Sequence, residues 1–364
     1  MIVVYDLRYA ADHFPGIGTH AFALLRALLD APGGERYRVL WNPAEPATRL
    51  DPGVLRSHPR VEWHECDVPS LGWVTPRRTG ALLRRLGGDV CFSPFSLMPV
   101  DPLMPVVLTL HDVLPLAPES RTPFWRRFVF AQAMRAADRA AAVLTSSEFS
   151  RGEIARRTRI TAGRVRVVRL GVLPSGPESA AAPRGTPPGP FALTVGINKP
   201  HKNLAVLGAA WRRFGTTPPL SLVAVGPSDP RFPGWDSLAS GASGVTALGR
   251  VSQPELEWLY RRAVLVLHPS RYEGFGLPVL EAASRGAPVV CADVPALREL
   301  GEGTARFVPP DDARGWADAV AVLAGDEAER ERMRVAGARL AAAHDYAACA
   351  ERVLAILREV AATR

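Results

Sequence analysis

Two glutamates stand eight residues apart around a glycine-rich turn in residues 268–291, HPSRYEGFGLPVLEAASRGAPVVC. Glu273 precedes Gly274 and Gly276, and Glu281 follows them. A turn that leads from a strand into a helix gathers unpaired N–H groups at the positive end of the helix dipole, which favours an anion. Carboxylates beside such a phosphate cradle suit the hydroxyl groups of a sugar or a ribose. The segment therefore predicts a pocket for a nucleotide-linked sugar.

The elements that must position these glutamates are indicated by the flanking sequence. Residues 263–267 (AVLVL) form an apolar run that is short and β-branched enough to be a buried strand. Pro278 stands where a helix would take its first residue, and Gly286 is a suitable stop. Residues 288–291 (PVVC) predict the next strand. A strand, a glycine loop and a helix would thus place both carboxylates at one end of a sheet.

Either glutamate alone has a plain explanation, because Glu281 can simply favour its helix dipole and Glu273 can be a solvated loop residue. The longer pattern is more specific. It closely resembles the donor-binding signature of retaining glycosyltransferases of family 4, in which two glutamates flank a Gly-Phe-Gly-Leu-Pro turn; the matching residues are Glu273, Gly274, Phe275, Gly276, Leu277, Pro278 and Glu281. The resemblance covers nearly the whole chain. It implies the α/β GT-B fold, with two Rossmann-like doubly wound domains facing each other across a cleft.

Composition is compatible with a two-domain protein of this kind. The 364 residues suit two domains of ordinary size, and a hydrophobic share of 47% provides ample core. No apolar segment reaches the length of a membrane span, and the strand-like start has no secretory n-region. Four cysteines without C-x-x-C spacing make disulfides and a cysteine metal site unexpected, which fits the cytoplasm; they are Cys66, Cys91, Cys291 and Cys349.

The basic excess is almost entirely arginine. Of 44 basic residues only two are lysines, Lys199 and Lys202, and this bias with high Ala and Pro is typical of a GC-rich genome. The pI is therefore a poor indicator of nucleic-acid binding. Residues 1–173 hold 23 Arg against 16 Asp and Glu, so +7 of the net +8 lies there. A solvated basic face is the default explanation, followed by steering of an anionic donor or docking on anionic lipid.

Residues 1–173 predict a doubly wound domain that begins with a strand, a glycine loop and a helix. Residues 8–19 are expected to form a long loop containing Gly16 and Gly18, followed by a helix over residues 20–29. The spacing of these glycines is too short for the dinucleotide fingerprint, which argues against an NAD site. The loop resembles the first-domain glycine loop of the family, which faces the donor phosphate, although a plain turn explains it equally well.

A histidine follows one of the strands predicted in this domain. Residues 106–110 (VVLTL) form a clear buried strand that leads into His111. A side chain at the carboxyl end of a parallel strand faces the ligand crevice. A lone histidine in such a place can simply be satisfied by a nearby backbone group. The phrase TLHDVLP, however, resembles the family's strand end, where the histidine lies next to the donor sugar, so we place His111 in the site.

Residues 122–142 predict a single long helix that carries aromatic residues beside arginines. The aromatic residues Phe124, Trp125, Phe128 and Phe130, beside Arg126 and Arg127, could form an interfacial face at a membrane, although aromatics on a helix are more often core. Peripheral contact of the basic first domain with the inner membrane face is therefore one expectation.

The domain boundary is predicted at residues 174–190 (PSGPESAAAPRGTPPGP), which have little to pack. Residues 191–345 would form the donor-binding domain. Residues 346–364 predict a final helix, which in GT-B proteins packs back on the first domain.

Both lysines fall in one loop, GINKPHKN, after a predicted strand over residues 191–195. Their retention in an arginine-rich chain suggests that a compact, flexible point charge is required there. Lys202 aligns with the pyrophosphate-binding lysine of the family, and Asn198 lies in the same loop. Many family members have an arginine directly after the glycine, where this chain has Ile197, so Lys199 is our substitute candidate for the second cation.

A second turn, Gly249-Arg250-Val251, precedes a helix predicted to begin near residue 254. In the family, backbone groups of this turn read the edge of the nucleobase. We therefore expect Val251 to contact the base and Arg250 to lie near the base or phosphate, although Arg250 can also be a solvated loop charge.

The resemblance implies transfer of a sugar from a nucleoside diphosphate sugar to an acceptor hydroxyl of a glycan, glycolipid or natural product, without a metal or another cofactor. The PHKNL turn resembles that of mannosyltransferases using GDP-mannose, and a UDP-sugar is the other option. Glu273, Lys202 and His111 are the expected catalytic residues. The diphosphate would be held by Gly16, Gly18, Asn198, Lys199, Lys202, Phe275, Gly276 and Leu277, and the nucleoside by Arg250, Val251 and Glu281. The alternatives are a nucleotide-sugar epimerase of the same fold and a non-catalytic nucleotide-sugar binding protein.

Overall fold

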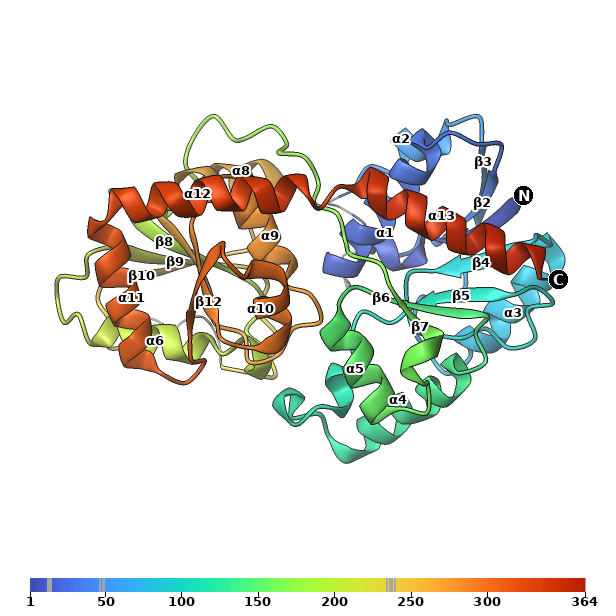
Figure 1. Cartoon of the computed structure of the whole chain (residues 1–364), viewed down its shortest axis with the longest axis horizontal. Coiled ribbons are helices and arrows are strands. Elements are labelled where there is room, and N and C mark those ends of the chain that lie inside the picture. Colours follow the sequence, from blue (N-terminus) through green and yellow to red (C-terminus); the bar gives the residue numbers. More distant parts are fainter. Residues whose placement is uncertain are drawn as a thin grey trace. The chain divides into compact units, whose positions relative to one another are not determined.

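A computed structural model describes residues 1–11, 15–45, 47, 50–233, 235, 238 and 240–363. The chain divides into two compact units (Figure 1). Unit 1 contains Met1–Leu116, Thr122–Gly171 and His344–Arg364, and unit 2 contains Ala117–Arg121 and Val172–Ala343. Neither unit is therefore a single continuous stretch of sequence.

Unit 1 is built on a parallel sheet of seven strands in the order β3-β2-β1-β4-β5-β6-β7. Strands β4, β5 and β6 are buried along their whole length, because the crossover helices of a parallel sheet cover both faces. The strands are β1 (Ile2–Asp6), β2 (Arg36–Trp41), β3 (Val61–Glu65), β4 (Val90–Ser93), β5 (Val106–Thr109), β6 (Ala142–Thr145) and β7 (Val165–Val167). The helices are α1 (Pro15–Asp30), α2 (Gly53–Arg56), α3 (Thr75–Leu86), α4 (Phe124–Ala137), α5 (Glu148–Arg157) and α13 (Tyr346–Ala362).

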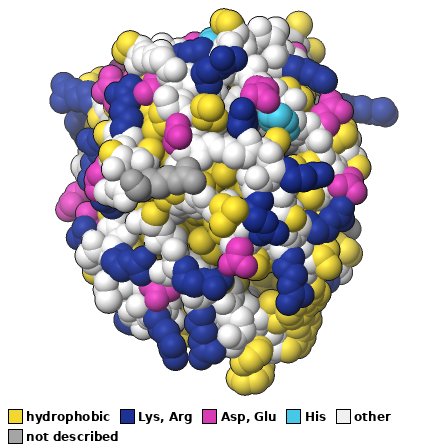
Figure 2. All heavy atoms as spheres, turned by 90° about the vertical axis from the view of Figure 1, so that its right-hand side faces the viewer, with side chains coloured by type: hydrophobic (Ala, Val, Ile, Leu, Met, Phe, Trp, Pro, Cys, Tyr) yellow, Lys and Arg dark blue, Asp and Glu magenta, His cyan; other side chains and the backbone are white. Residues whose placement is uncertain are grey.

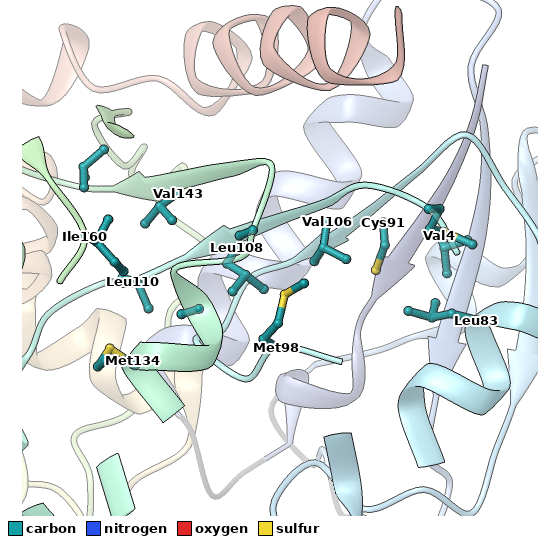
Figure 3. Packing of buried hydrophobic residues seen from close by; sticks show 14 of the residues in the cluster. Val4, Leu83, Cys91, Met98, Val106, Leu108, Leu110, Met134, Val143 and Ile160 are labelled. Carbon is teal, nitrogen blue, oxygen red and sulfur yellow. The ribbon is translucent and has the colours of Figure 1, made fainter. Parts of the chain in front are cut away.

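The core of unit 1 lies between this sheet and its helices. Val4, Cys91 and Val106 come from three neighbouring strands and pack with Leu83 of α3 and Met134 of α4 (Figure 3). These five side chains are at most 2% exposed. Burial on this scale is the main favourable term in folding, and it fixes the carboxyl ends of β4 and β5 where polar residues follow.

The last helix completes unit 1. Helix α13 packs against α1 and β4. A Cβ added at Gly171 would lie 2.5 Å from the backbone nitrogen of Tyr346, so the chain can pass the start of α13 only with a glycine there. Two ion pairs anchor the helix. Glu359 of α13 pairs with Arg166, and Arg358 of α13 pairs with Glu35.

Unit 2 is built on a parallel sheet of six strands in the order β10-β9-β8-β11-β12-β13. The strands are β8 (Phe191–Val195), β9 (Ser221–Val225), β10 (Val245–Gly249), β11 (Leu265–His268), β12 (Val289–Ala292) and β13 (Ala305–Val308). The helices include α6 (Leu204–Arg212), α8 (Gln253–Arg262), α9 (Leu277–Ser284), α10 (Pro295–Gly301), α11 (Ala313–Gly325) and α12 (Glu327–Ala342). Short 3-10 helices at Arg8–Ala10, Leu114–Leu116, Pro118–Ser120 and Ala162–Arg164 interrupt the first half of the chain, and another, η5 (Pro200–Lys202), follows β8.

The predicted glycine loop of unit 1 is largely helical, which corrects the sequence prediction. Helix α1 begins at Pro15, so Gly16 and Gly18 lie in its first turn; the part of the predicted loop at residues 12–14 lies outside the described residues. Proline is favoured at the start of a helix, since its missing N–H has no partner there in any case. Gly18 is buried, and a Cβ on it would lie 3.1 Å from the carbonyl oxygen of Tyr9, so this glycine lets α1 pack against the preceding turn.

The long helix predicted over residues 122–142 is wrong in its second part. Helix α4 ends at Ala137, and β6 begins at Ala142 after a turn. The ladder with β5 overrides helix propensity here, because Ala141 donates its N–H to the carbonyl of Val106. Residues 174–190 contain no helix or strand, and their contacts place them in unit 2.

Candidate functional site

Three side chains from different parts of the chain meet in unit 2. The Nζ of Lys202 lies 2.6 Å from Oε1 of Glu273, and Nε2 of His268 lies 2.8 Å from the same oxygen. Lys202 ends η5, His268 is the last residue of β11, and Glu273 lies in the turn that leads to α9. Strands β8 and β11 are paired, so η5 and this turn both leave the carboxyl ends of adjacent strands. Ligands of open parallel sheets bind at such ends.

Asn203 fixes the turn that presents Lys202. Its φ of 54° is in the left-handed region, where Asn is tolerated better than most residues. Its side-chain amide donates to the carbonyls of Pro269 and Pro310 at 3.1 and 2.6 Å. The backbone N–H of Arg271 also donates to the carbonyl of His201 at 2.8 Å. These bonds hold η5 against the turn after β11, and therefore hold Lys202 against Glu273.

The charges in this cluster are strongly coupled. Burial alone would raise the pKa of Glu273, but Lys202 and His268 overcome it and hold that pKa well below its ordinary value. The pKa of the neighbouring His201 is also lowered, to about 4, because burial and then the charge of Lys202 disfavour its protonated form. At neutral pH the cluster therefore contains an ionised carboxylate at Glu273, and the adjacent His201 is neutral.

The glycine-rich turn begins α9 without a capping side chain. Gly276 precedes the helix with φ 104° and makes no side-chain cap bond. A Cβ at this position would lie 2.6 Å from Cδ2 of Leu297, so both the backbone angle and the space require glycine. The positive end of the helix dipole at Leu277 is accordingly not neutralised by a capping carboxylate or hydroxyl. Phe275, by contrast, is 7% exposed and packs into the unit.

Glu281 lies one turn further along α9 and has a different partner. The hydroxyl of Tyr260, on α8, donates to Oε2 of Glu281 at 3.0 Å. Burial and the nearby Glu281 raise the pKa of Tyr260 well above its ordinary value, so the phenol remains a donor. Beneath it Arg285 pairs with Glu257, and both side chains are nearly inaccessible, at 4% and 1%. The two predicted glutamates are therefore held by separate networks.

Asn198 is engaged by backbone groups of unit 2. Its amide nitrogen donates to the carbonyls of Asp229 and Pro233 at 3.1 and 2.9 Å, and its oxygen accepts from the N–H of Asp229. This amide holds the loop after β9 in place, and its contact with a diphosphate stays a prediction. Lys199 lies directly before η5, is half-buried, and accepts a backbone bond from Lys202 at 2.9 Å.

The predicted nucleoside turn follows β10. Arg250 is exposed and Val251 is half-buried. Gly249 has φ 66° and accepts a hydrogen bond from the N–H of Gly226, so the ends of β9 and β10 are tied together. A Cβ on Gly226 would lie 1.6 Å from the carbonyl oxygen of Gly196, which brings the start of the lysine loop to the same strand ends.

The other predicted residues belong to unit 1. His111 follows β5, is half-buried, and its Nε2 lies 3.0 Å from the carbonyl oxygen of Pro94. Since a carbonyl only accepts, Nε2 carries the proton. Burial lowers the pKa of His111 to about 4. Its ring meets that of His20 edge to face at 5.4 Å, and Gly16 is exposed at the first turn of α1.

Sequence reasoning missed His268, Asn203 and Tyr260. His268 was assigned no role, although its position directly after the strand predicted over residues 263–267 could have indicated one. Asn203 could have been found as a residue suited to a left-handed turn. Tyr260 lies 21 residues before Glu281, and no spacing rule connects them.

Among the described residues, candidates for a metal site and for a membrane-spanning helix are absent. No group of three or more His, Cys, Asp or Glu side chains there is arranged to hold a metal ion. In the same part of the chain, no helix combines the length and apolar character that crossing a membrane requires.

Two family models match this sequence. The model described as Glycosyltransferase Family 4 matches residues 15–175, and the model described as Glycosyl transferases group 1 matches residues 189–326. Between them the two models account for most of the chain.

Characterised relatives share moderate identity with the chain. O-antigen chain mannosyltransferase B of Escherichia coli is 28% identical over 279 residues, which is 70% of each protein. Alpha-D-kanosaminyltransferase of Streptomyces kanamyceticus is 28% identical over 323 residues, 80% of this chain and 82% of that protein.

Solved structures share the arrangement of elements along nearly the whole chain. HepE of Anabaena in complex with UDP-glucose has a TM-score of 0.72 at 18% identity, covering 99% of this chain and 100% of that one. Sucrose-phosphate synthase of Thermosynechococcus elongatus has a TM-score of 0.71 at 18% identity, covering 100% and 99%. At this identity the likeness establishes the fold.

Proposed function

This chain belongs to the family 4 glycosyltransferases of GT-B fold, and from that premise we propose that it uses a nucleoside diphosphate sugar as donor and retains the anomeric configuration. The observation that carries the proposal is the fixed carboxylate of Glu273, paired with Lys202 next to the start of α9. The carboxylate suits a sugar hydroxyl. The ammonium group suits a phosphate, and the helix N-terminus suits a second phosphate oxygen.

The reaction breaks the bond between the anomeric carbon and the diphosphate oxygen and forms one to the acceptor oxygen. The acceptor's proton leaves with the diphosphate, on which negative charge develops. Lys202, Lys199 and the amides at the start of α9 would stabilise this charge where it appears. Glu273 would orient the sugar through its hydroxyl groups, and Glu281, steadied by Tyr260, would bind the ribose.

Mannose from GDP-mannose is the donor sugar that we propose first. Support comes from the lysine turn of the sequence and from the similarity to O-antigen chain mannosyltransferase B. A UDP-sugar is the second candidate, because HepE, which shares the fold, was solved with UDP-glucose. The proposed acceptor is a hydroxyl of a glycan, glycolipid or natural product.

The test is a comparison of donor turnover in the wild type and in Glu273→Ala. Wild-type protein is incubated with GDP-mannose, UDP-glucose or dTDP-glucose, and release of the nucleoside diphosphate is measured with and without acceptor sugars. We expect turnover with one donor and a ~10²- to 10³-fold loss in Glu273→Ala. Binding of the intact donor without turnover in either protein would instead identify a non-catalytic binder.

We also propose that α4 docks on an anionic membrane surface. Phe124, Trp125 and Phe128 are 84%, 60% and 58% exposed, and Arg126 lies over the ring of Trp125 at 4.9 Å. Phe130, which was predicted to share this face, instead packs against the core of unit 1. Figure 2 shows hydrophobic side chains gathered near the lower edge of the view, with arginines beside them. In Figure 1, which has the same vertical axis, α4 lies at the lower end of unit 1. Aromatic and arginine side chains together favour the interface of anionic lipids.

Co-sedimentation with vesicles tests this docking. We expect binding to vesicles containing phosphatidylglycerol, weaker binding to pure phosphatidylcholine, and a clear loss in Trp125→Ser/Phe128→Ser. The matched control is Val322→Ser, an exposed apolar residue of unit 2. Equal binding of the double variant and the control would reject the proposal.

A further inference from the structure

Glu273 receives both of its hydrogen bonds on one oxygen. Lys202 and His268 approach Oε1 at 2.6 and 2.8 Å. Within the part of the chain that the structure describes, no hydrogen bond to Oε2 is present. The second oxygen is therefore the part of the carboxylate that can accept from a ligand hydroxyl.

The two donors to Oε1 differ in rigidity. His268 is the last residue of β11, its backbone is in register with Cys291 of β12, and its side chain is 3% exposed. Lys202 extends from a single 3-10 turn, carries four rotatable bonds and is 18% exposed. The imidazole is consequently the fixed partner of the carboxylate, and the ammonium is the partner that can reorient.

A diphosphate would compete with Glu273 for Lys202. It carries more negative charge than one carboxylate and offers several strong acceptor oxygens. If Lys202 turned toward it, Glu273 would lose one of its two donors while still 12% exposed. Without His268 as well, Glu273 would have no partner, which is costly for a buried carboxylate. Its side chain would then be free to leave the position in which Oε2 meets the sugar.

We propose that His268 is a positioning residue that keeps Glu273 in place while Lys202 binds the diphosphate. The inference rests on the proposed function, in which Lys202 contacts the diphosphate and Glu273 the sugar. Because a carboxylate only accepts, Nε2 of His268 carries a hydrogen in either protonation state of the ring. A glutamine at this position can also donate through its Nε2, whereas a leucine cannot.

The experiment combines His268→Leu and His268→Gln with Glu273→Ala in a double-mutant cycle. Turnover and binding are measured with the donor that the wild type uses, and affinity for the nucleoside diphosphate alone is measured by calorimetry. Urea unfolding of each variant verifies that it is folded. The control is His64→Leu, the same change on edge strand β3 of unit 1, where His64 pairs with Glu62.

We expect His268→Leu to lower kcat/KM by ~10- to 100-fold, as displacement of a positioned group does. His268→Gln should stay within about threefold of the wild type, and diphosphate affinity should change little in either variant. In the Glu273→Ala background, His268→Leu should have no further effect, because the group through which it acts is gone.

Three outcomes would overturn the inference while leaving the proposed function intact. They are wild-type turnover in His268→Leu, equal losses in the Leu and Gln variants, and an undiminished loss in the Glu273→Ala background. A wild type that neither binds nor turns over any donor would overturn the proposed function, and this inference with it.

Discussion

Two histidines at the ends of central parallel strands have different partners in the two units. In unit 1, Nε2 of His111 donates to the neutral carbonyl of Pro94 at 3.0 Å, and burial lowers its pKa to about 4. In unit 2, Nε2 of His268 donates to the carboxylate of Glu273 at 2.8 Å. The residue type and its place on the sheet are therefore insufficient to assign a role. Burial makes His111 a neutral donor to the backbone, whereas the carboxylate partner makes His268 part of an ionised cluster.

The largest effect is expected from removing the ammonium group in unit 2. Among the described residues, Lys202→Met leaves His268 as the one hydrogen-bond donor to Glu273, and it removes the cation from the proposed diphosphate site. We expect turnover to fall by ~10²- to 10³-fold and nucleoside diphosphate affinity to fall with it. Steady-state kinetics and calorimetry measure the two effects. Loss of turnover with unchanged diphosphate affinity would mean that Lys202 serves Glu273 alone.

The next effect concerns the pH dependence of unit 1. His111 has a folded pKa of about 4, below its unfolded value of ~6.5, so the unfolded chain binds the extra proton between these values. Stability should therefore fall as pH falls from ~6.5 to ~4, by as much as ~3 kcal/mol for this residue. Urea unfolding at pH 4.5 to 7.5 should show a weaker dependence in His111→Gln, which keeps a donor to Pro94 and cannot titrate.

Two other histidines also contribute to the pH dependence of stability, so the curve of the variant must be compared with that of the wild type. The pKa of His20 is lowered by burial and by His111, and that of His201 by burial and by Lys202. Both contribute to the wild-type curve with the same sign. Parallel curves for the wild type and His111→Gln would show that His111 titrates normally. Turnover of His111→Gln in the same series tests its predicted place beside the donor sugar.

A smaller effect is expected from the second lysine. Lys199→Met should weaken nucleoside diphosphate binding by about tenfold, or ~1.4 kcal/mol, if this lysine supplies the second cation. Titration with GDP and UDP measures the loss. Arg250→Met is the comparison, because this exposed arginine is the other cation assigned near the diphosphate. A loss in Arg250→Met alone would move the second cation to the turn after β10.

The smallest effect concerns buried hydroxyls of unit 1. In the part of the chain that the structure describes, Oγ1 of Thr145 is buried without a hydrogen-bond partner, whereas Oγ1 of Thr79 accepts from Arg8 at 3.1 Å. Thr145→Val should leave stability unchanged or raise it by up to ~1 kcal/mol, and Thr79→Val should lower it by ~1 to 3 kcal/mol. Urea unfolding measures both. The opposite order would indicate an ordered water at Thr145.

The sequence predicted the strands better than the contacts between their ends. The apolar run at residues 191–195 became β8 with the expected bounds, and the run at residues 106–110 became β5, which ends one residue earlier. Helix limits were less accurate where a tertiary contact decides them. Gly18 looked like a loop residue, but its missing side chain serves the packing of a helix.

The contacts around Glu273 could not be predicted from the local sequence. Lys202 and Glu273 are 71 residues apart, and their contact depends on the pairing of β8 with β11. The resemblance of the motifs named both residues, but only the fold shows that they share an oxygen with His268. The roles of these residues and the rest of the predicted site toward a ligand stay predictions until the variants are measured.

The position of α13 has a consequence for synthesis of the chain. This helix packs on α1 and β4, although it follows the whole of unit 2 in the sequence and is therefore synthesised after it. The sheet of unit 1 is therefore made early, but the helix that packs on it follows only after unit 2, which consists of Ala117–Arg121 and Val172–Ala343. Domains fold during translation as their residues become available. Unit 1 begins to form first but should accordingly be completed after unit 2. Truncation after residue 343 should therefore destabilise unit 1 and leave unit 2 folded.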